Sequence, residues 1–397
     1  MNCKMFGFLI GLALTCPVAC SQPDGDNDNT NGNDNSGNAN DNTTVEVPDG
    51  FPPAARVDFD AADRLIVDGE IDESGEVIVY DVGPLGIGDF LDVQCIARTG
   101  SDLDPMMALF DRDGFRVFWN DDINPGTSNF DSAFDGYIRH DSNYFLAVAS
   151  TSFFSTEGSF RCTVERMPEV GVAAILGQTV VINLEAADDV TVSGINYGDL
   201  DEFSAATIGD DFTDADTEAL LDRILEIVGS DFAPFDLTLL TSDDVPPAGK
   251  FSRVFLGSSS QGIPIFGIAD DIDFYNGNDM DEAIVFMESF DGLTSNLDAT
   301  AQAIANVISH EIGHTLGLMH TNDVTELMDT TGADVTLLDD QSFGVAEIVD
   351  FPIGRQNSPL LLEETIGRAA AAKGEFPRDG QWRCGTCGAT LHFIAGK

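Results

Sequence analysis

The sequence predicts a multidomain protein in which an all-β sandwich is followed by an α/β (α+β) domain. The chain has 397 residues, which is more than one average domain. Residues 51–167 contain short alternating runs broken by Gly, Asp and Pro, whereas residues 171–365 combine strand-like runs with helical periods. Apolar residues make up 43% of the chain, enough to form hydrophobic cores.

The first 20 residues have the pattern of an export signal. A single cation, Lys4, precedes an apolar run that is too short to span a bilayer as a helix. Small residues before Cys20 resemble a bacterial lipoprotein cleavage site, in which the Cys becomes the lipidated first residue. Pro17 stands where Leu is usual, so lipidation of Cys20 and simple cleavage remain equally open. We expect an exported bacterial protein, either a cell-surface lipoprotein or an extracellular protein.

Residues 21–50 are expected to form a disordered linker, because Asp and Asn dominate residues 24–44 and nothing there can bury apolar surface. Beyond the signal and Cys20, four cysteines remain in an exported chain. Cys95 and Cys162 lie in strand-like runs of the same region, which predicts a disulfide between them. Cys384 and Cys387 lie in a C-terminal tail, residues 366–397. They could form a local disulfide, half a zinc ribbon or a redox pair.

Residues 51–167 read as strands separated by turns every 8 to 15 residues or so, as in a sandwich. The expected strands are 76–82, 90–97, 107–110, 115–119 and 144–149. The motifs at 79–81, 88–91, 109–114, 120–122 and 144–148 resemble the bacterial pre-peptidase C-terminal domain, a small β-sandwich attached to secreted peptidases. That family usually follows its peptidase, whereas here the sandwich would precede it.

Residues 171–365 predict a mixed α/β unit. Strands are expected at 179–184, 235–240, 253–256, 264–269 and 283–287. Apolar spacing predicts a helix over 214–228, with Thr213 as N-cap and Gly229 as its stop. A second helix is expected over 297–316, with an apolar stripe at Ile304, Ile308 and Ile312 facing the core.

Three of the five histidines in the chain fall within eleven residues at the end of this second helix. His310 and His314 are four residues apart, so both imidazoles point to the same side and can reach one zinc ion at about 2 Å. Glu311 lies on the adjacent line, where it can reach a zinc-bound water. Gly317 allows the chain to turn and to bring His320 to the same metal. Three neutral protein ligands leave a fourth position open, as a catalytic zinc site requires.

The stretch from His310 to His320 resembles the metzincin zinc endopeptidases, and the spacing to Met328 is similar to that of the matrixins. The resemblance implies that Met328 lies beneath the zinc and supports its ligands. It also implies that the run Phe266, Gly267, Ile268 and Ala269 is the edge strand that pairs with an extended peptide. Thr330 stands where some metzincins have a Tyr ligand, so no such ligand is expected.

The acidic run that begins at Asp270, Asp271 and Asp273 has two readings. Clustered oxygen atoms suit Ca²⁺, and matrixin-like domains carry structural calcium. A solvated acidic loop explains the same residues equally well. We therefore expect one catalytic Zn²⁺ and leave Ca²⁺ open.

The formal charge of −51 argues against nucleic acid as a partner of the whole chain, because phosphate binding needs clustered Lys and Arg. We expect protein or peptide substrates, and contact with a membrane only through a lipid anchor. The sequence therefore predicts a zinc-dependent endopeptidase with Glu311 as general base. The alternative is a non-catalytic surface-binding protein with a peptidase-like scaffold. The sequence leaves the oligomeric state undetermined.

Overall fold

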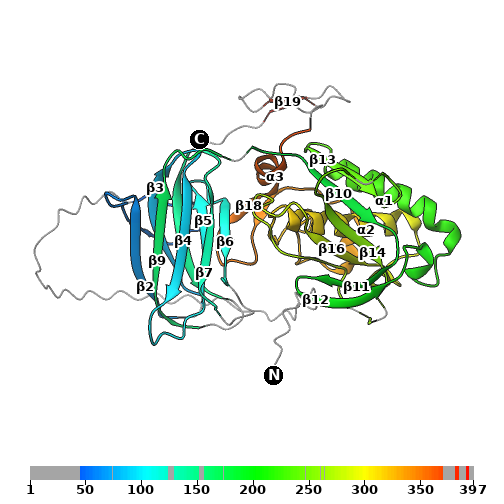
Figure 1. Ribbon diagram of the computed structural model, residues 1–397, viewed down its shortest axis with the longest axis horizontal. Coiled ribbons are helices and arrows are strands. Elements are labelled where there is room, and N and C mark those ends of the chain that lie inside the picture. Colours follow the sequence, from blue (N-terminus) through cyan, green and yellow to red (C-terminus); the bar gives the residue numbers. More distant parts are fainter. Residues whose placement is uncertain are drawn as a thin grey trace, which may run out of the picture.

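The computed structural model describes residues 45–369, apart from positions 74, 124–128, 152–155, 173, 246, 260 and 263, together with two short strands at 381–383 and 390–392. A β-sandwich and an α/β unit lie side by side, with β18 (Arg355–Asn357) and α3 (Ser358–Ile366) between them (Figure 1). The predicted fold class is confirmed. The predictions for the export signal, Cys20, residues 21–44, Cys384 and Cys387 fall outside the described residues.

The sandwich consists of two sheets. One has the order β1-β3-β8-β5-β6 and the other β2-β9-β4-β7, with β1 parallel to β3 and the other pairs antiparallel. Their bounds are β1 Ala54–Arg56, β2 Arg64–Ile71, β3 Val77–Leu85, β4 Phe90–Ala97, β5 Pro105–Asp111, β6 Arg116–Asn120, β7 Ser132–Tyr137, β8 Ser142–Ser150 and β9 Gly158–Met167.

Cys95 on β4 lies directly opposite Cys162 on β9, and the two are joined by a disulfide bond. The core between the sheets contains alternate residues of several strands, such as Met107 and Leu109 of β5 and Leu146 and Val148 of β8. Strand β5 is different, because all of its residues are buried. Its continuous apolar sequence suits a strand that is covered on both faces.

The second unit is built on a five-stranded sheet of order β13-β10-β14-β16-β15. Its strands are β10 Gln178–Asn183, β13 Leu237–Thr241, β14 Ser252–Gly257, β15 Gly267–Ala269 and β16 Glu282–Phe286. Four strands are parallel, and β15 runs antiparallel to β16 at the edge. The strand expected at 264–269 is shorter than predicted, because β15 begins only at Gly267.

Two helices, α1 (Thr217–Asp231) and α2 (Leu297–Thr315), pack against one face of this sheet and against each other. The α2 stripe at Ile304, Ile308 and Ile312 is fully buried, as its spacing predicts. The expected stop of α1 at Gly229 is wrong. The helix continues to Asp231 and is capped at Phe232, which is buried in the core. Gly229 is not among the glycines with a positive φ, so its conformational freedom is not used to end the helix.

A hairpin of β11 (Ala187–Val192) and β12 (Ile195–Leu200) covers the opposite face of the sheet, where Val192 and Tyr197 contact Phe286 and its neighbours. Two further hairpins pair β17 (Val345–Glu347) with β18, and β19 (Gln381–Arg383) with β20 (Thr390–His392). Within the described part of the chain, no helix combines the length and apolar character needed to cross a membrane.

The two units share buried surface. Ile348 and Phe351 of the α/β unit pack against the outer face of the β5 sheet, and the Phe351 ring lies 5.7 Å from the Phe110 ring. A polar contact joins the units nearby. His140 of the sandwich lies with Nε2 at 3.4 Å from Asp111 Oδ2 and Nδ1 at 3.0 Å from Glu364 Oε1 of α3.

Replacing His140 with Gln should lower the free energy of unfolding by about 1–2 kcal/mol at pH 6. The contacts with Asp111 and Glu364 raise the pKa of His140 to about 10, so the folded protein holds this proton more tightly than the unfolded chain. The stabilisation is therefore complete below pH 6.5 and is lost as the pH rises through 10.

Denaturant unfolding at pH 6 and pH 10 measures this difference. Arg64→Gln is the matched control, because Arg64 pairs with Glu165 on the exposed surface and should matter little at either pH. An equal loss of stability at both pH values for His140→Gln would contradict the assigned ion pair.

Candidate metal centre

The centre lies at the C-terminal end of α2, one of the two helices that pack against one face of the sheet. Asn296 caps the start of the helix by accepting a hydrogen bond from Ala299 N at 3.0 Å. The helix ends after Thr315, and Gly317 follows at φ +89°. A side chain at that position would press against the backbone of Asp273 and Phe274. Glycine therefore permits both the turn and the close approach that bring His320 back.

The three predicted histidines converge. His314 Nε2 lies 3.0 Å from His310 Nε2 and 3.1 Å from His320 Nε2. All three residues are buried, with at most 9% exposure. They are the one group of three metal-ligating side chains found among the described residues.

The opposite ring nitrogens fix the tautomers. His310 Nδ1 lies 2.8 Å from Leu327 O, and His314 Nδ1 lies 2.8 Å from Leu318 O. Because a carbonyl oxygen only accepts, each Nδ1 carries the proton and each Nε2 presents a lone pair. Asp350 holds the third ring, with its Oδ1 at 3.4 Å from His320 Nδ1 and its Oδ2 accepting from His320 N at 3.1 Å.

This donor set fits a zinc ion. Facing lone pairs at about 3 Å repel one another unless a cation lies between them, and three imidazole nitrogens are a common zinc ligand set. Burial lowers the pKa of His310 to about 3, with the nearby His320 as a second cause. Burial also lowers the pKa of His314. The rings of His310 and His314 are therefore neutral at physiological pH and available as ligands.

Glu311 lies beside the histidines and against the edge strand. Its side chain is buried, which raises its pKa to about 8. A Cβ added at Gly267 of β15 would collide with the Glu311 carboxyl group. The predicted substrate strand and the predicted base are thus in direct contact. Phe266, beside the strand, packs on Phe290 with ring centroids 5.0 Å apart.

Met328 is fully buried under the helix. Its sulfur occupies the space that a Cβ on Gly313 would need, so Gly313 is required for this close packing. Thr321, next to His320, donates its backbone N–H to Met328 O at 2.8 Å. Met328 therefore packs directly on the helix that carries His310 and His314, and the supporting role implied by the resemblance stays a prediction.

A small cavity of about 40 Å³ opens between α2 and the loop after Met328. It is lined by Phe266, Asn306, Val307, His310, Glu311, Leu327, Asp329, Thr330, Gly332, Ala333, Asp334, Thr336, Leu337 and Gln341. That volume admits about three water molecules. The cavity therefore offers room for one small group beside His310 and Glu311.

The carboxylates of the acidic run next to β15 accept backbone hydrogen bonds that stabilise the local fold. Asp270 accepts hydrogen bonds from Ser193 N and Glu282 N, both at 2.8 Å, and Asp273 accepts from Gly277 N at 3.0 Å. The Asp273 N–H caps α2 by donating to His314 O at 3.1 Å. Asp271 accepts from the adjacent Ile272 N. The calcium site stays a prediction, and these contacts give it no support.

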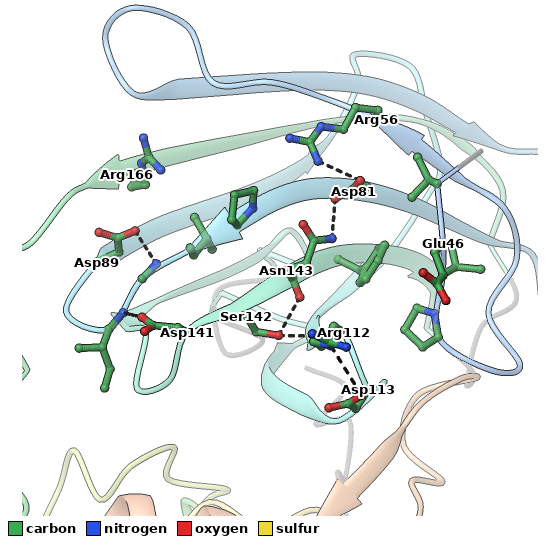
Figure 2. A pocket seen from close by; sticks show the side chains of 18 of the residues that line it. Glu46, Arg56, Asp81, Asp89, Arg112, Asp113, Asp141, Ser142, Asn143 and Arg166 are labelled. Carbon is green, nitrogen blue, oxygen red and sulfur yellow. Dashed lines mark hydrogen bonds and ion pairs between the residues drawn. The ribbon is translucent and has the colours of Figure 1, made fainter. Parts of the chain in front are cut away.

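A larger groove of about 1380 Å³ lies in the sandwich and is lined by none of the three histidines (Figure 2). Several of its carboxylates are engaged in hydrogen bonds or ion pairs within the sandwich. Arg56 Nη1 lies 3.0 Å from Asp81 Oδ2, Asn143 Nδ2 donates to Asp81 Oδ1 at 2.9 Å, and Asp141 accepts from Ile87 N at 2.7 Å. We therefore assign the chemistry to the histidine centre.

Some supporting residues were not predicted from the sequence. Asp350 holds His320 from 30 residues away. Glu326 is buried and accepts from Thr321 Oγ1 at 2.9 Å and from Met328 N at 2.6 Å. Its position two residues before Met328 was the available signal, but an isolated Glu in a loop does not reveal burial.

Comparison with known proteins agrees with this geometry. The family described as Met-zincin matches residues 294–325, which include the three histidines and Glu311. A search of curated proteins gave no match.

Three solved structures are similar in part. Archaemetzincin from Methanopyrus kandleri is 14% identical, with 48% of this chain and 96% of that chain covered and a TM-score of 0.27. A zinc-dependent peptidase from Methanocorpusculum labreanum is 13% identical, with 47% and 100% covered and a TM-score of 0.25. The pre-peptidase C-terminal domain of a Bacillus anthracis collagenase is 12% identical, with 29% and 99% covered and a TM-score of 0.23. Residues 294–325 thus match the Met-zincin family model, and this segment contains the three histidines that together could hold a metal ion.

Proposed function

We propose that the protein is an exported zinc-dependent endopeptidase that uses Glu311 as general base. The observation that carries the proposal is the convergence of three buried Nε2 atoms beside a buried carboxyl group and an edge strand. His310, His314 and His320 would hold the zinc ion. When bound, zinc supplies electrophilic activation of water and of a peptide carbonyl.

The other steps belong to side chains and backbone of this chain. Glu311 takes a proton from the attacking water and gives it to the leaving amine. Its raised pKa of about 8 suits a base that must later act as an acid, and a nearby dication would lower that pKa toward neutrality. Strand β15 pairs with β16 along one edge, and an extended peptide added along its other edge would pass directly over Glu311.

Replacing Glu311 with Gln should leave zinc bound and lower turnover by about 10²–10⁴-fold. The amide keeps the shape of the side chain but cannot accept the proton. His314→Ala should instead lose zinc and activity together, because it removes a ligand. Hydrolysis of a quenched peptide library by the purified chain, with zinc content measured in parallel, tests both variants.

Full turnover by Glu311→Gln would refute the assigned base. A stoichiometric zinc content in His314→Ala would refute the ligand set. Zinc bound by the wild-type chain without cleavage of any peptide would instead support the alternative, a non-catalytic surface-binding protein on a peptidase-like scaffold.

Replacing Gly267 with Ala should lower kcat by about 10-fold or more and leave zinc content unchanged. The new Cβ would displace the Glu311 carboxyl group, and small displacements of a catalytic group are costly. Steady-state kinetics on a cleaved library peptide measure the effect. Gly229→Ala is the matched control, because its Cβ would meet open space on α1. An unchanged kcat in Gly267→Ala would show that β15 does not position the Glu311 carboxyl group.

We also propose that the protein is exported by residues 1–20. The Cys95–Cys162 disulfide supports this proposal, because such bonds persist in oxidising compartments. Mass spectrometry of the N-terminus of the native protein should find a start near residue 20, with a lipid mass on Cys20 if it is a lipoprotein. A native protein that retains Met1 would refute cleavage.

A further inference from the structure

A buried arginine of the sandwich reaches into the chain that joins two of the histidines. Arg116 on β6 is 1% exposed. Its Nη2 donates to Gly317 O and to Gln356 Oε1, both at 2.8 Å. Its guanidinium group lies over the Phe274 ring, 4.7 Å from the centroid. All three partners belong to the α/β unit.

Such burial is costly for a cation, so the partners that compensate for it matter. Among the described residues, Arg116 Nε and Nη1 have no hydrogen-bond acceptor. The Phe274 ring and the charge of Asp350 remain to stabilise the cation. An apolar side chain of similar volume could fill this position, so packing alone does not require an arginine here. Its two hydrogen bonds are therefore the features that need an explanation.

Both bonds hold the segment between His314 and His320. Gly317 is the residue at which the chain leaves α2, so its carbonyl orientation determines the path to His320. Gln356 is fully buried and holds the next part of the segment, since its Oε1 accepts from Met319 N at 2.8 Å and its Nε2 donates to Met319 O at 2.9 Å. Arg116 thus orients the segment directly and through Gln356.

The same hydrogen-bond network continues to the Met328 turn. Gln356 Nε2 donates to Ser358 Oγ at 3.2 Å, and Ser358 Oγ donates to Glu326 Oε1 at 2.6 Å. The other oxygen of Glu326 accepts from Met328 N at 2.6 Å. A continuous chain of hydrogen bonds therefore leads from the sandwich to the residues beneath the histidines.

A second contact links the sandwich to His320. Asp350 holds both the backbone N–H and the ring of His320. The next residue, Phe351, is 1% exposed and packs on Phe110 of β5. The direction of the Asp350 carboxylate therefore depends on a side chain seated against the sandwich.

We propose that the β-sandwich is part of the metal centre, with Arg116 as a positioning residue that orients the His314–His320 segment for zinc binding. This inference rests on the zinc centre of the proposed function, but not on its peptidase activity. It predicts that a change in the sandwich, far from the histidines in sequence, weakens zinc binding.

The test uses the full chain with Arg116→Met, which keeps much of the volume and removes both donors. We expect the zinc dissociation constant, measured by competition with a chelator, to rise about 10–100-fold, as for other residues that orient metal ligands. The visible absorption of the cobalt-substituted protein should change as well, because it reports ligand geometry. Arg116→Lys, which keeps one donor group, should recover part of the affinity.

The matched control is Arg161→Met, another sandwich arginine. Arg161 on β9 forms an exposed ion pair with Asp68 on β2, so its charge is paired within the sandwich. It should bind zinc as the wild type does. Wild-type affinity and an unchanged cobalt spectrum in Arg116→Met would overturn the inference.

If Arg116→Met does not fold, Phe110→Leu decides the question, because it loosens the seat of Phe351 and keeps an apolar core. A several-fold weaker zinc affinity supports the inference, and an unchanged affinity overturns it. Peptide cleavage by the wild-type chain is measured separately. Its absence with normal zinc binding would refute the peptidase proposal and leave the role of Arg116 intact.

Discussion

The convergence of three imidazole lone pairs is the constraint on which the surrounding structure depends. Neutral nitrogens that face one another at 3.0–3.1 Å in a buried site repel unless a cation separates them. Each ring must therefore be held in place by a contact at its other nitrogen, Nδ1. Leu327 O, Leu318 O and Asp350 do this for His310, His314 and His320 respectively.

The contacts at the three Nδ1 atoms explain features elsewhere in the fold. Leu327 precedes Met328, so the turn that holds His310 also brings a sulfur atom beneath Gly313. Leu318 follows Gly317, whose positive φ lets the chain fold back onto its own helix. Asp350 precedes Phe351, which is anchored on the sandwich. Each ligand therefore depends on a different neighbouring element.

The sequence could predict the ligands because their spacing is local. His310 and His314 share one side of a helix, and Gly317 marks the turn before His320. The sandwich was also predictable from alternation and turn residues, whereas the edge position of the strand at 266–269 was implied only by the resemblance to metzincins. The hairpin of β11 and β12 was not predicted, because its sequence is too polar to signal a strand that covers a sheet.

Arg116 illustrates a different limit. In sequence it follows a turn and resembles a surface residue, while its two hydrogen-bond acceptors lie 201 and 240 residues away. No local pattern encodes such a pair. Asp350 and Gln356 are similar, since short polar stretches around them give no sign that they are held in a buried network.

These long-range contacts couple metal binding to docking of the two units. Zinc binds the arrangement in which the His314–His320 segment is ordered, and the sandwich stabilises that same arrangement through Arg116 and Phe110. By linkage, whatever favours docking strengthens zinc binding, and bound zinc must favour docking by the same free energy.

Contacts between residues so far apart in the chain also form late. The entropic cost of closing a long loop must be met before the contacts at its ends can stabilise the structure. The metal centre should therefore be completed only after both units have folded and met.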